Sequence, residues 1–523
     1  MIFERTILRF FSLLAAATLL FTACGGDSEE VTPQVEVETG TGAWDEGEDA
    51  PLQPDLDGRL TVDASRSELP ADVRIADDGT ALELPYAATE LVLAVQSDIQ
   101  LELQPLSEAL LTVEEEPFTA GDFDAMNRYR IRKVLCAPEV AAREVTLCFR
   151  RRGLTELYDE DRITLRLEAN PTRMEGLITF ADADYTCDFG RYVDNELGRL
   201  TLPAGKELVA EFDAGEDPWV KVEPLETDGS VWRVLGGWRP NDPTADGRRQ
   251  AARLVIRDTD GSHREEYTLV RRNWGLPVTW YYGTWWCKYN ARGRSRSFED
   301  QILVPQDPAV AAGKSVLDYL TSCSSEEFRA LWGWAYQGDS GEGLQVADVE
   351  GIPAMEGFTT GIASHINKLP ADALAPDGYE LPSMEEFNRL FDATDYVWMM
   401  WSGSHTLRTP WEGHTAVKRT QKRRNGITVG SLTLDDLLVV AMSSPDFPEY
   451  EALTWYGPGA QWNSAGIRHS NHCNNILFAV HSPEGSGWYI NGGMSNLYMT
   501  RNGAGNNDTR IVRFKKSPVE YIY

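Results

Sequence analysis

The stretch EVTLCFR at residues 144–150 alternates apolar and polar side chains, and ITLRLE at residues 163–168 repeats the alternation. A period of two is typical of a β-strand with one buried face, because successive side chains point to opposite sides of a sheet. Similar alternation, or a short apolar run, recurs at residues 91–95, 206–212, 219–222, 252–257 and 266–271. Short strands of this kind, separated by polar turns such as DTDG at residues 258–261, predict β-sandwiches. We expect two of them, at residues 59–170 and 171–274.

Both predicted sandwiches end in the same way, with a basic residue, an alternating strand, a turn and a second alternating strand. Across residues 80–272 this arrangement resembles the immunoglobulin-like BACON domain, and residues 171–274 form the BACON-like unit proper. Such domains recur in surface lipoproteins linked to glycan use, so the resemblance implies spacers without a catalytic site. Trp219, Trp232 and Trp238 are either exposed platforms or, as we expect for Trp219, core residues.

Residues 1–23 have the composition of an export signal. Arg5 and Arg9 precede an almost wholly apolar stretch at residues 10–21, which is short for a membrane span. The segment ends FTAC, and small residues before a cysteine resemble the lipobox of bacterial lipoproteins. The resemblance implies cleavage before Cys24 and attachment of acyl chains, such as palmitate, to Cys24. The alternative is an ordinary signal peptide followed by an incidental cysteine.

An acidic segment at residues 24–58 follows the signal. It begins CGGDSEE, which resembles the export tag of lipoproteins on the outer face of the outer membrane of Gram-negative bacteria. From Asp27 to Asp57 it holds eleven acidic residues and no basic residue. Because like charges repel, we expect a disordered, extended tether that holds the folded part away from the membrane.

The charge of the whole chain is unevenly distributed. The 81 acidic and 49 basic residues give a net charge of −32, which argues against a nucleic-acid partner. Residues 1–274 hold 54 of the acids and 29 of the bases, whereas residues 275–523 hold 27 and 20. Residues 455–523 hold only three acids against six bases, so acidic or sulfated ligands stay open for that end of the chain.

Six further cysteines follow Cys24, and they form no CxxC pair, which argues against a zinc ribbon or a thioredoxin-type site. They are Cys136, Cys148, Cys187, Cys287, Cys323 and Cys473. An exported protein meets an oxidising compartment, where disulfides persist. Cys136 with Cys148, and Cys287 with Cys323, are candidate pairs. The alternative for each is a buried free thiol.

The composition changes near residue 275, since eleven of the sixteen tryptophans lie from Trp280 onward. WWCKYNARG at residues 285–293 and DGYELPSMEEF at residues 377–387 resemble motifs of the superfamily of formylglycine-generating enzymes and related bacterial lectin-like domains. WNS at 462–464, NILFAV at 475–480 and RIVRF at 510–514 resemble three later strands of that superfamily. The resemblance implies an α+β C-type-lectin-like domain over residues 275–523, with small twisted sheets, two helices and long loops. The predicted fold class is thus multidomain, with two all-β immunoglobulin-like sandwiches before this domain.

The motif at residues 377–387 also has a direct physical meaning. Pro382 cannot continue a strand, and Ser383 with Glu386 three positions later forms a capping box. Phe387, Leu390 and Phe391 then follow at helical spacing. The sequence predicts a strand that turns sharply into an amphipathic helix, which is structural rather than catalytic chemistry.

An enzymatic role is not expected. Active formylglycine-generating enzymes use two cysteines five positions apart to bind copper, and the matching region here holds only Cys473. His469, His472 and Cys473 are weak candidates for a metal such as zinc. The chain has no G-x-S-x-G or H-E-x-x-H motif. We therefore expect no catalytic residue, no metal and no cofactor, with calcium as a faint alternative suggested by Asn507 and Asp508.

Residues 455–523 favour ligand binding, because they combine asparagine, glycine and aromatic residues. Asparagine donates and accepts hydrogen bonds, aromatic rings stack on the apolar faces of sugars, and glycine permits long loops such as those expected at 485–489 and 503–508. The candidate ligand-binding residues are Trp455, Trp462, Asn463, Trp488, Tyr489, Asn491, Asn507 and Asp508. The alternative is that the tryptophans are core residues.

These features together predict a lipid-anchored protein on the outer-membrane surface of a Gram-negative bacterium, which recognises a glycan or other surface ligand through residues 275–523. Its partners would be the membrane lipid, that ligand, and other fimbrial or glycan-uptake proteins. One alternative is an accessory or tip subunit of a surface fimbria or other adhesive assembly. A second, disfavoured by the missing cysteine, is a formylglycine-generating-type enzyme.

Overall fold

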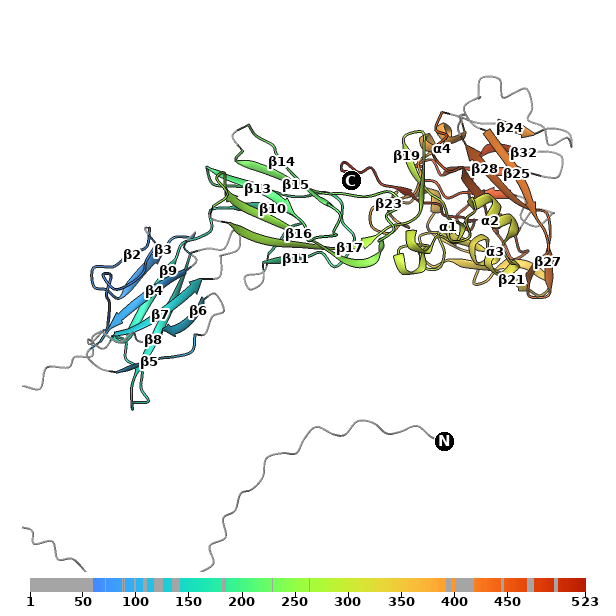
Figure 1. Ribbon diagram of the computed structural model, residues 1–523. Coiled ribbons are helices and arrows are strands. Elements are labelled where there is room, and N and C mark those ends of the chain that lie inside the picture. Colours follow the sequence, from blue (N-terminus) through green and yellow to red (C-terminus); the bar gives the residue numbers. More distant parts are fainter. Residues whose placement is uncertain are drawn as a thin grey trace, which may run out of the picture. The chain divides into compact units, whose positions relative to one another are not determined.

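The computed structural model describes residues 60–523 except residues 71, 87, 89, 98–99, 107–110, 117–125, 134–141, 181–184, 228, 263, 392–396, 401–417, 444–445, 468–474 and 493–496. The described chain is mostly β-sheet, with several separate sheets and a few short helices (Figure 1). No helix in these ranges has the length and apolar character needed to cross a membrane. The predicted signal, the tether and Cys24 lie outside the described residues, as do Cys136, His469, His472 and Cys473.

The first part of the described chain, residues 60–167, consists of two sheets around one core. Their strand orders are β1-β4-β7-β6 and β2-β3-β9-β8-β5. The strands are β1 (Thr61–Val62), β2 (Arg74–Ile75), β3 (Ala81–Leu84), β4 (Glu90–Gln96), β5 (Leu101–Leu103), β6 (Leu111–Glu116), β7 (Met126–Lys133), β8 (Arg143–Arg151) and β9 (Arg162–Leu167). Leu93 and Ile131 of one sheet and Leu147 and Leu165 of the other are buried in the same core. The strands predicted at residues 91–95, 144–150 and 163–168 are confirmed as β4, β8 and β9.

The second part, residues 173–274, repeats the plan with two four-stranded sheets. Their orders are β10-β12-β15-β14 and β11-β17-β16-β13. The strands are β10 (Arg173–Gly176), β11 (Thr186–Asp188), β12 (Asn195–Thr201), β13 (Lys206–Glu211), β14 (Val220–Pro224), β15 (Val231–Gly236), β16 (Asp246–Asp258) and β17 (Glu265–Trp274). The strands predicted at residues 206–212, 252–257 and 266–271 are confirmed. Trp219 is a core residue, as expected, and Trp238 is also buried, whereas Trp232 is half-buried.

The described residues of the third part, residues 275–523, form five small sheets with the orders β18-β19-β34-β23, β22-β21-β20-β33, β24-β32-β31-β30, β25-β28-β29 and β26-β27. The strands before residue 401 are β18 (Val278–Tyr281), β19 (Thr284–Cys287), β20 (Trp334–Gln337), β21 (Leu344–Val349), β22 (Ile352–Met355), β23 (Tyr379–Glu380) and β24 (Val397–Met400). The later ones are β25 (Lys418–Arg424), β26 (Ile427–Val429), β27 (Leu432–Leu434), β28 (Leu437–Ser443), β29 (Leu453–Tyr456), β30 (Asn475–Leu477), β31 (Ser486–Gly492), β32 (Leu497–Gly503), β33 (Thr509–Arg510) and β34 (Lys515–Lys516). Expected small sheets are thus present.

The described third part has four α-helices, where the family resemblance implied two. They are α1 (Pro308–Ala311), α2 (Val316–Ser322), α3 (Ser325–Trp332) and α4 (Met384–Phe391), accompanied by three short 3₁₀ turns at Phe298–Asp300, Val304–Gln306 and Ile366–Lys368. The N-cap residues just before the first three helices are Asp307, Ser315 and Ser324, whose side chains accept hydrogen bonds from the first turn. These N-caps are signals that the sequence prediction left unused.

Helix α4 confirms the physical prediction made from the motif at residues 377–387. The Ser383 amide donates to Glu386 Oε2 at 2.8 Å, and the Glu386 amide donates to Ser383 Oγ at 3.2 Å, which completes the capping box. Phe387, Leu390 and Phe391 are buried in the core that also contains Trp286 and Trp455.

Three local predictions in the third part need correction. Residues 462–464 form no strand in the described structure, because Asn463 Oδ1 accepts the Ala465 amide at 2.9 Å and bends the chain. The loop expected at residues 485–489 is largely strand β31, which pairs with β32. The strand expected at 510–514 is interrupted, since β33 ends at Arg510 and β34 begins at Lys515. The loop expected at 503–508 is present after Gly503.

Candidate functional site

A groove with a volume of about 330 Å³ lies beside the hairpin of β18 and β19. One wall is formed by Trp280, Thr284 and Trp285 of the hairpin, with Glu386 of α4 beside them. Lys515 and Lys516 of β34 also line the groove, and Ser517, Pro518, Val519 and Ile522 form its other wall. We call this feature the aromatic groove. Its volume is at the small end of the range for ligand pockets.

The hairpin that carries the tryptophans is set by a tight two-residue turn. Tyr282 and Gly283 both have positive φ angles, 45° and 84°, as a type I′ turn requires. The strand register places Trp280 directly opposite Trp285, so the two rings share one face of the hairpin. Tyr281 and Trp286 belong to the other face and are buried in the core.

Neighbouring aromatic rings hold both tryptophans in place. Trp280 packs edge to face on Phe447 with ring centroids 4.4 Å apart, and it also lies 5.6 Å from Tyr450. Trp285 packs at right angles to Tyr450, at 5.6 Å. All four side chains are half-buried, so the cluster keeps an accessible surface. Preoriented aromatic rings next to a groove suit the apolar face of a ligand and cost little side-chain entropy on binding.

The floor of the groove is charged but internally paired. Lys515 Nζ lies 2.5 Å from Glu380 Oε1 and 2.8 Å from Glu386 Oε1, and the lysine side chain is only 7% exposed. Glu386 also caps helix α4, so one carboxylate serves the helix and the groove together. Thr284 Oγ1 lies 3.5 Å from the same carboxylate. The groove therefore offers polar groups without an unpaired lysine among the residues that line it.

A second pocket, of about 580 Å³, lies in the first part of the chain. Its walls include Arg74, Glu83, Arg166 and Glu168, and none of the described residues that line it is aromatic. Arg166 is already paired with Glu144 at 3.0 Å. We regard this pocket as a charged surface recess, and the aromatic groove as the better candidate site.

Two of the predicted ligand-binding tryptophans are in the core, and that prediction is wrong for them. Trp455 is 0% exposed and Trp488 is 1% exposed, and both pack in the core with Phe387 and Phe478. The Trp488 indole donates to Asn388 Oδ1 at 3.0 Å, which satisfies its N–H group internally. A ring with no exposed surface cannot stack on a ligand.

The other predicted residues lie nearer the surface but do not gather at the groove. Trp462, Asn463, Tyr489 and Asn491 are half-buried, the last two on β31. Asn507 and Asp508 are already used in contacts within the protein. Asn507 Oδ1 accepts the Gly361 amide at 2.9 Å, and Asp508 Oδ2 lies 3.2 Å from Arg510 Nη2. None of these described side chains lines the aromatic groove.

The residues that do line the groove were missed by the prediction. The available signal was the stretch WYYGTWW at residues 280–286, in which a glycine lies between three aromatic residues and two more. Glu386 was recognised as a capping residue only. Lys515 has no local signal, because its partners are more than a hundred positions away in the sequence.

The cysteines that the structure describes are free thiols. They are Cys148, Cys187, Cys287 and Cys323. The alternative of a disulfide between Cys287 and Cys323 is therefore wrong, since the two side chains lie in different core clusters. Burial raises the pKa of the Cys287 thiol well above its usual range. Within the described residues, no three His, Cys, Asp or Glu side chains are grouped to hold a metal ion, and the candidates His469, His472 and Cys473 lie outside those residues.

Comparison with known proteins identifies no family. No protein-family model and no curated protein sequence matches the chain. Among solved structures, the cadherin-like domains 1 to 4 of zebrafish RET match 41% of this chain and 52% of their own length, with 8% identity and a TM-score of 0.14. This chain thus spans about half of that protein. SporoSAG from Toxoplasma gondii matches 37% of this chain and 96% of its own length, with 10% identity and a TM-score of 0.15. A protein of unknown function from Porphyromonas gingivalis matches 41% of this chain and its whole length, with 12% identity and a TM-score of 0.13.

Proposed function

We propose that this chain is a lipid-anchored surface protein of a Gram-negative bacterium that binds a saccharide in the aromatic groove. The observation that carries the proposal is the pair of opposed, half-buried tryptophans, Trp280 and Trp285, beside a polar floor. Sugars present an apolar face to a ring and hydroxyl groups to polar side chains, and the groove offers both kinds of partner.

The pairing of charges supports an uncharged saccharide as the ligand. Lys515 is held by Glu380 and Glu386, and Lys516 is held by Asp194. An anionic sugar would have to compete with these carboxylates for the lysines. Hydroxyl groups need no such exchange, since they can accept from the lysine and donate to the carboxylate oxygens while the ion pairs persist.

The architecture supports a stalk that carries the binding part. The first and second parts each enclose one core between two sheets, as an immunoglobulin-like spacer does. The third part combines small sheets with capped helices, which suits a C-type-lectin-like domain. The proposed anchor is an acylated Cys24 at the end of an acidic tether.

A saccharide screen with the purified full chain tests the proposal. We expect binding to neutral oligosaccharides, and an at least about fivefold weaker affinity for Trp280→Ala or Trp285→Ala, since loss of one stacking ring costs about 1 kcal/mol or more. Trp232→Ala is the matched control, because Trp232 is also half-buried but belongs to the second part. Absence of saccharide binding by the wild-type chain would refute the proposal, and co-purification with filaments would then favour a structural subunit.

The proposed acylation of Cys24 can be tested separately. Cells that express the full chain should incorporate labelled palmitate into the protein, and Cys24→Ala should abolish the labelling and release the protein from the membrane fraction. Labelling that persists in Cys24→Ala would place the acyl chain elsewhere.

A further inference from the structure

We infer that Asp194 and Asn195, which belong to the second part of the chain, position one wall of the aromatic groove in the third part. The contact runs through residues 516–523, which we call the strap. The strap leaves strand β34, forms the groove wall through Ser517, Pro518, Val519 and Ile522, and is held from its other side by the second part.

The two lysines of β34, at the start of the strap, face opposite ways. In β34, Lys515 pairs with Trp286 and Glu380, and Lys516 pairs with Tyr379. Successive side chains of a strand alternate between its two sides. Lys515 accordingly reaches Glu380 and Glu386 at the groove floor, whereas Lys516 reaches Asp194 of the second part.

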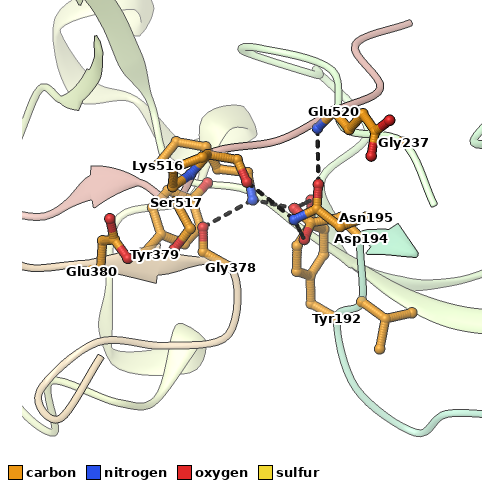
Figure 2. Close-up of polar contacts among 12 residues, drawn as sticks. Tyr192, Asp194, Asn195, Gly237, Gly378, Tyr379, Glu380, Lys516, Ser517 and Glu520 are labelled. Atoms are coloured by element: carbon orange, nitrogen blue, oxygen red, sulfur yellow. Dashed lines mark hydrogen bonds and ion pairs between the residues drawn. The ribbon is translucent and has the colours of Figure 1, made fainter. Parts of the chain in front are cut away.

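Lys516 is enclosed by groups from both parts of the chain. Its ammonium donates to Asp194 Oδ2 and, at 2.8 Å, to the Gly378 carbonyl (Figure 2). The rings of Tyr192, Tyr379 and Trp238 surround it with centroids 5.0, 5.4 and 5.4 Å away. The side chain is 1% exposed. A buried ammonium is stable only with a charged partner, and Asp194 is that partner.

Asn195 fixes the next turn of the strap. Its Nδ2 donates to the Pro518 carbonyl at 3.0 Å, and its Oδ1 accepts the Glu520 amide at 2.8 Å. Figure 2 shows the Asn195 side chain directed at the strap, with Glu520 above it. Both polar groups of the Asn195 side-chain amide therefore form hydrogen bonds with the backbone of the strap. Asn195 has a φ of 61°, a left-handed conformation that asparagine tolerates better than most residues.

The end of the strap pairs with the second part like a short strand. The Trp238 amide donates to the Tyr521 carbonyl at 2.9 Å, and Trp238 and Ile522 form a parallel β-bridge. Arg233 Nη2 lies 2.7 Å from Glu520 Oε1. Backbone groups at 518, 520 and 521 thus bond to the second part, so the position of the wall depends on that part.

Hydrogen exchange of the full chain tests the positioning without any ligand. In Asp194→Asn and in Asn195→Gly, we expect the Glu520 and Trp238 amides to exchange at least about tenfold faster than in the wild type, because each substitution removes a partner that closes the strap. Glycine keeps the positive φ at position 195, so this variant deletes only the side chain. Amides of strand β28 should be unchanged, which shows that the third part stays folded.

Glu196→Gln is the matched control, because Glu196 lies on the same strand β12 but pairs with Arg199 on the surface. It should leave strap exchange unaltered. If Asp194→Asn fails to fold, Asn195→Gly alone decides the question, since it leaves no buried charge unpaired. Unchanged strap exchange in Asn195→Gly would overturn the inference.

The consequence for ligand binding rests on the function proposed above. Asn195→Gly should weaken saccharide binding several-fold although residue 195 does not line the groove, while Trp280→Ala should weaken binding at least about fivefold and leave strap exchange as in the wild type. Faster strap exchange with unchanged affinity would overturn the claim that the strap positions the groove. If the wild type binds no saccharide, the proposed function fails, and the exchange result still decides whether Asp194 and Asn195 hold the strap.

Discussion

The guanidinium carbon of Arg513 lies 4.8 Å from the centre of the Trp455 ring, inside the core of the third part. Arg513 Nε donates to Asn290 Oδ1 at 2.9 Å, and its two terminal nitrogens donate to the carbonyls of Cys287 and Thr454 at 3.0 and 3.1 Å. The side chain is 1% exposed, and burial lowers its pKa. Trp455 is thus covered by a cation of its own chain, which explains why its ring does not face a ligand.

Arg513→Lys should lower the free energy of unfolding of the third part by about 2–4 kcal/mol. The three donors of a lysine ammonium sit on one nitrogen, so they cannot reach all the acceptors that the separate nitrogens of Arg513 reach. Each buried acceptor left without a partner costs about 1–3 kcal/mol. Urea unfolding followed by tryptophan fluorescence measures the change. The control is Arg389→Lys on the exposed side of α4, for which we expect a change within about 0.5 kcal/mol. Equal effects of the two substitutions would show that Arg513 does not hold the core.

Ser383→Ala should destabilise the third part by about 1 kcal/mol, through loss of the capping box of α4. The Ser383 hydroxyl accepts the Glu386 amide, and alanine leaves that amide without its partner. Ser383→Thr is the matched control, because threonine retains the hydroxyl and should keep most of the stability. A loss of equal size in both variants would point to packing rather than capping.

The capping box of α4 and the contacts of Arg513 differ in whether they could be predicted from the sequence. The cap of α4 is local, because Ser383 and Glu386 are three positions apart and their residue types alone indicate the bond. The alternating strands of the first two parts are likewise local patterns, and they are confirmed. The partners of Arg513 lie at positions 287, 290 and 454, so no local sequence pattern predicts these contacts.

The aromatic residues show the same limit at the candidate site. In strands as short as β18 and β19, alternation tells that Trp285 and Trp286 face opposite ways, but not which of them faces the core. The composition of residues 455–523 led us to predict Trp455 and Trp488 as ligand-binding residues, but both are buried in the core. The contact of the strap with the second part could not be predicted from the sequence either, since Asn195 and Pro518 are 323 positions apart.

Lys515 and Glu386 should show strong energetic coupling. Lys515→Met leaves two carboxylates of the groove floor without their cation, and breaking a buried ion pair costs about 3–5 kcal/mol. Because Glu386 and Lys515 touch, the double variant Lys515→Met/Glu386→Gln should lose clearly less than the sum of the single losses. Urea unfolding of the wild type, Lys515→Met, Glu386→Gln and the double variant gives the four free energies of unfolding that this double-mutant cycle needs. Additive losses would mean that the two side chains stabilise the fold independently.

Asp242 should make the contact between the second and third parts sensitive to acid. Burial alone would raise the pKa of this carboxyl, but hydrogen bonds from Asn273 and from the amide and hydroxyl of Thr244 outweigh it and hold the pKa below the ordinary value of 3.8. The adjacent Asn241 bonds both backbone groups of Val278, at the start of the third part. The unfolded chain therefore takes up this proton before the folded chain does, as the pH falls through about 4. The contribution to stability is present above that pH and is lost as the pH falls through the lower, folded-state value.

Asp242→Asn should be less stable than the wild type near neutral pH, and the difference in stability should shrink in acid, as measured by thermal unfolding over a pH series. The exposed Asp339→Asn is the control and should follow the wild type at every pH. A constant gap between Asp242→Asn and the wild type down to strongly acidic pH would contradict the prediction, because it would assign the loss to packing and not to the charge.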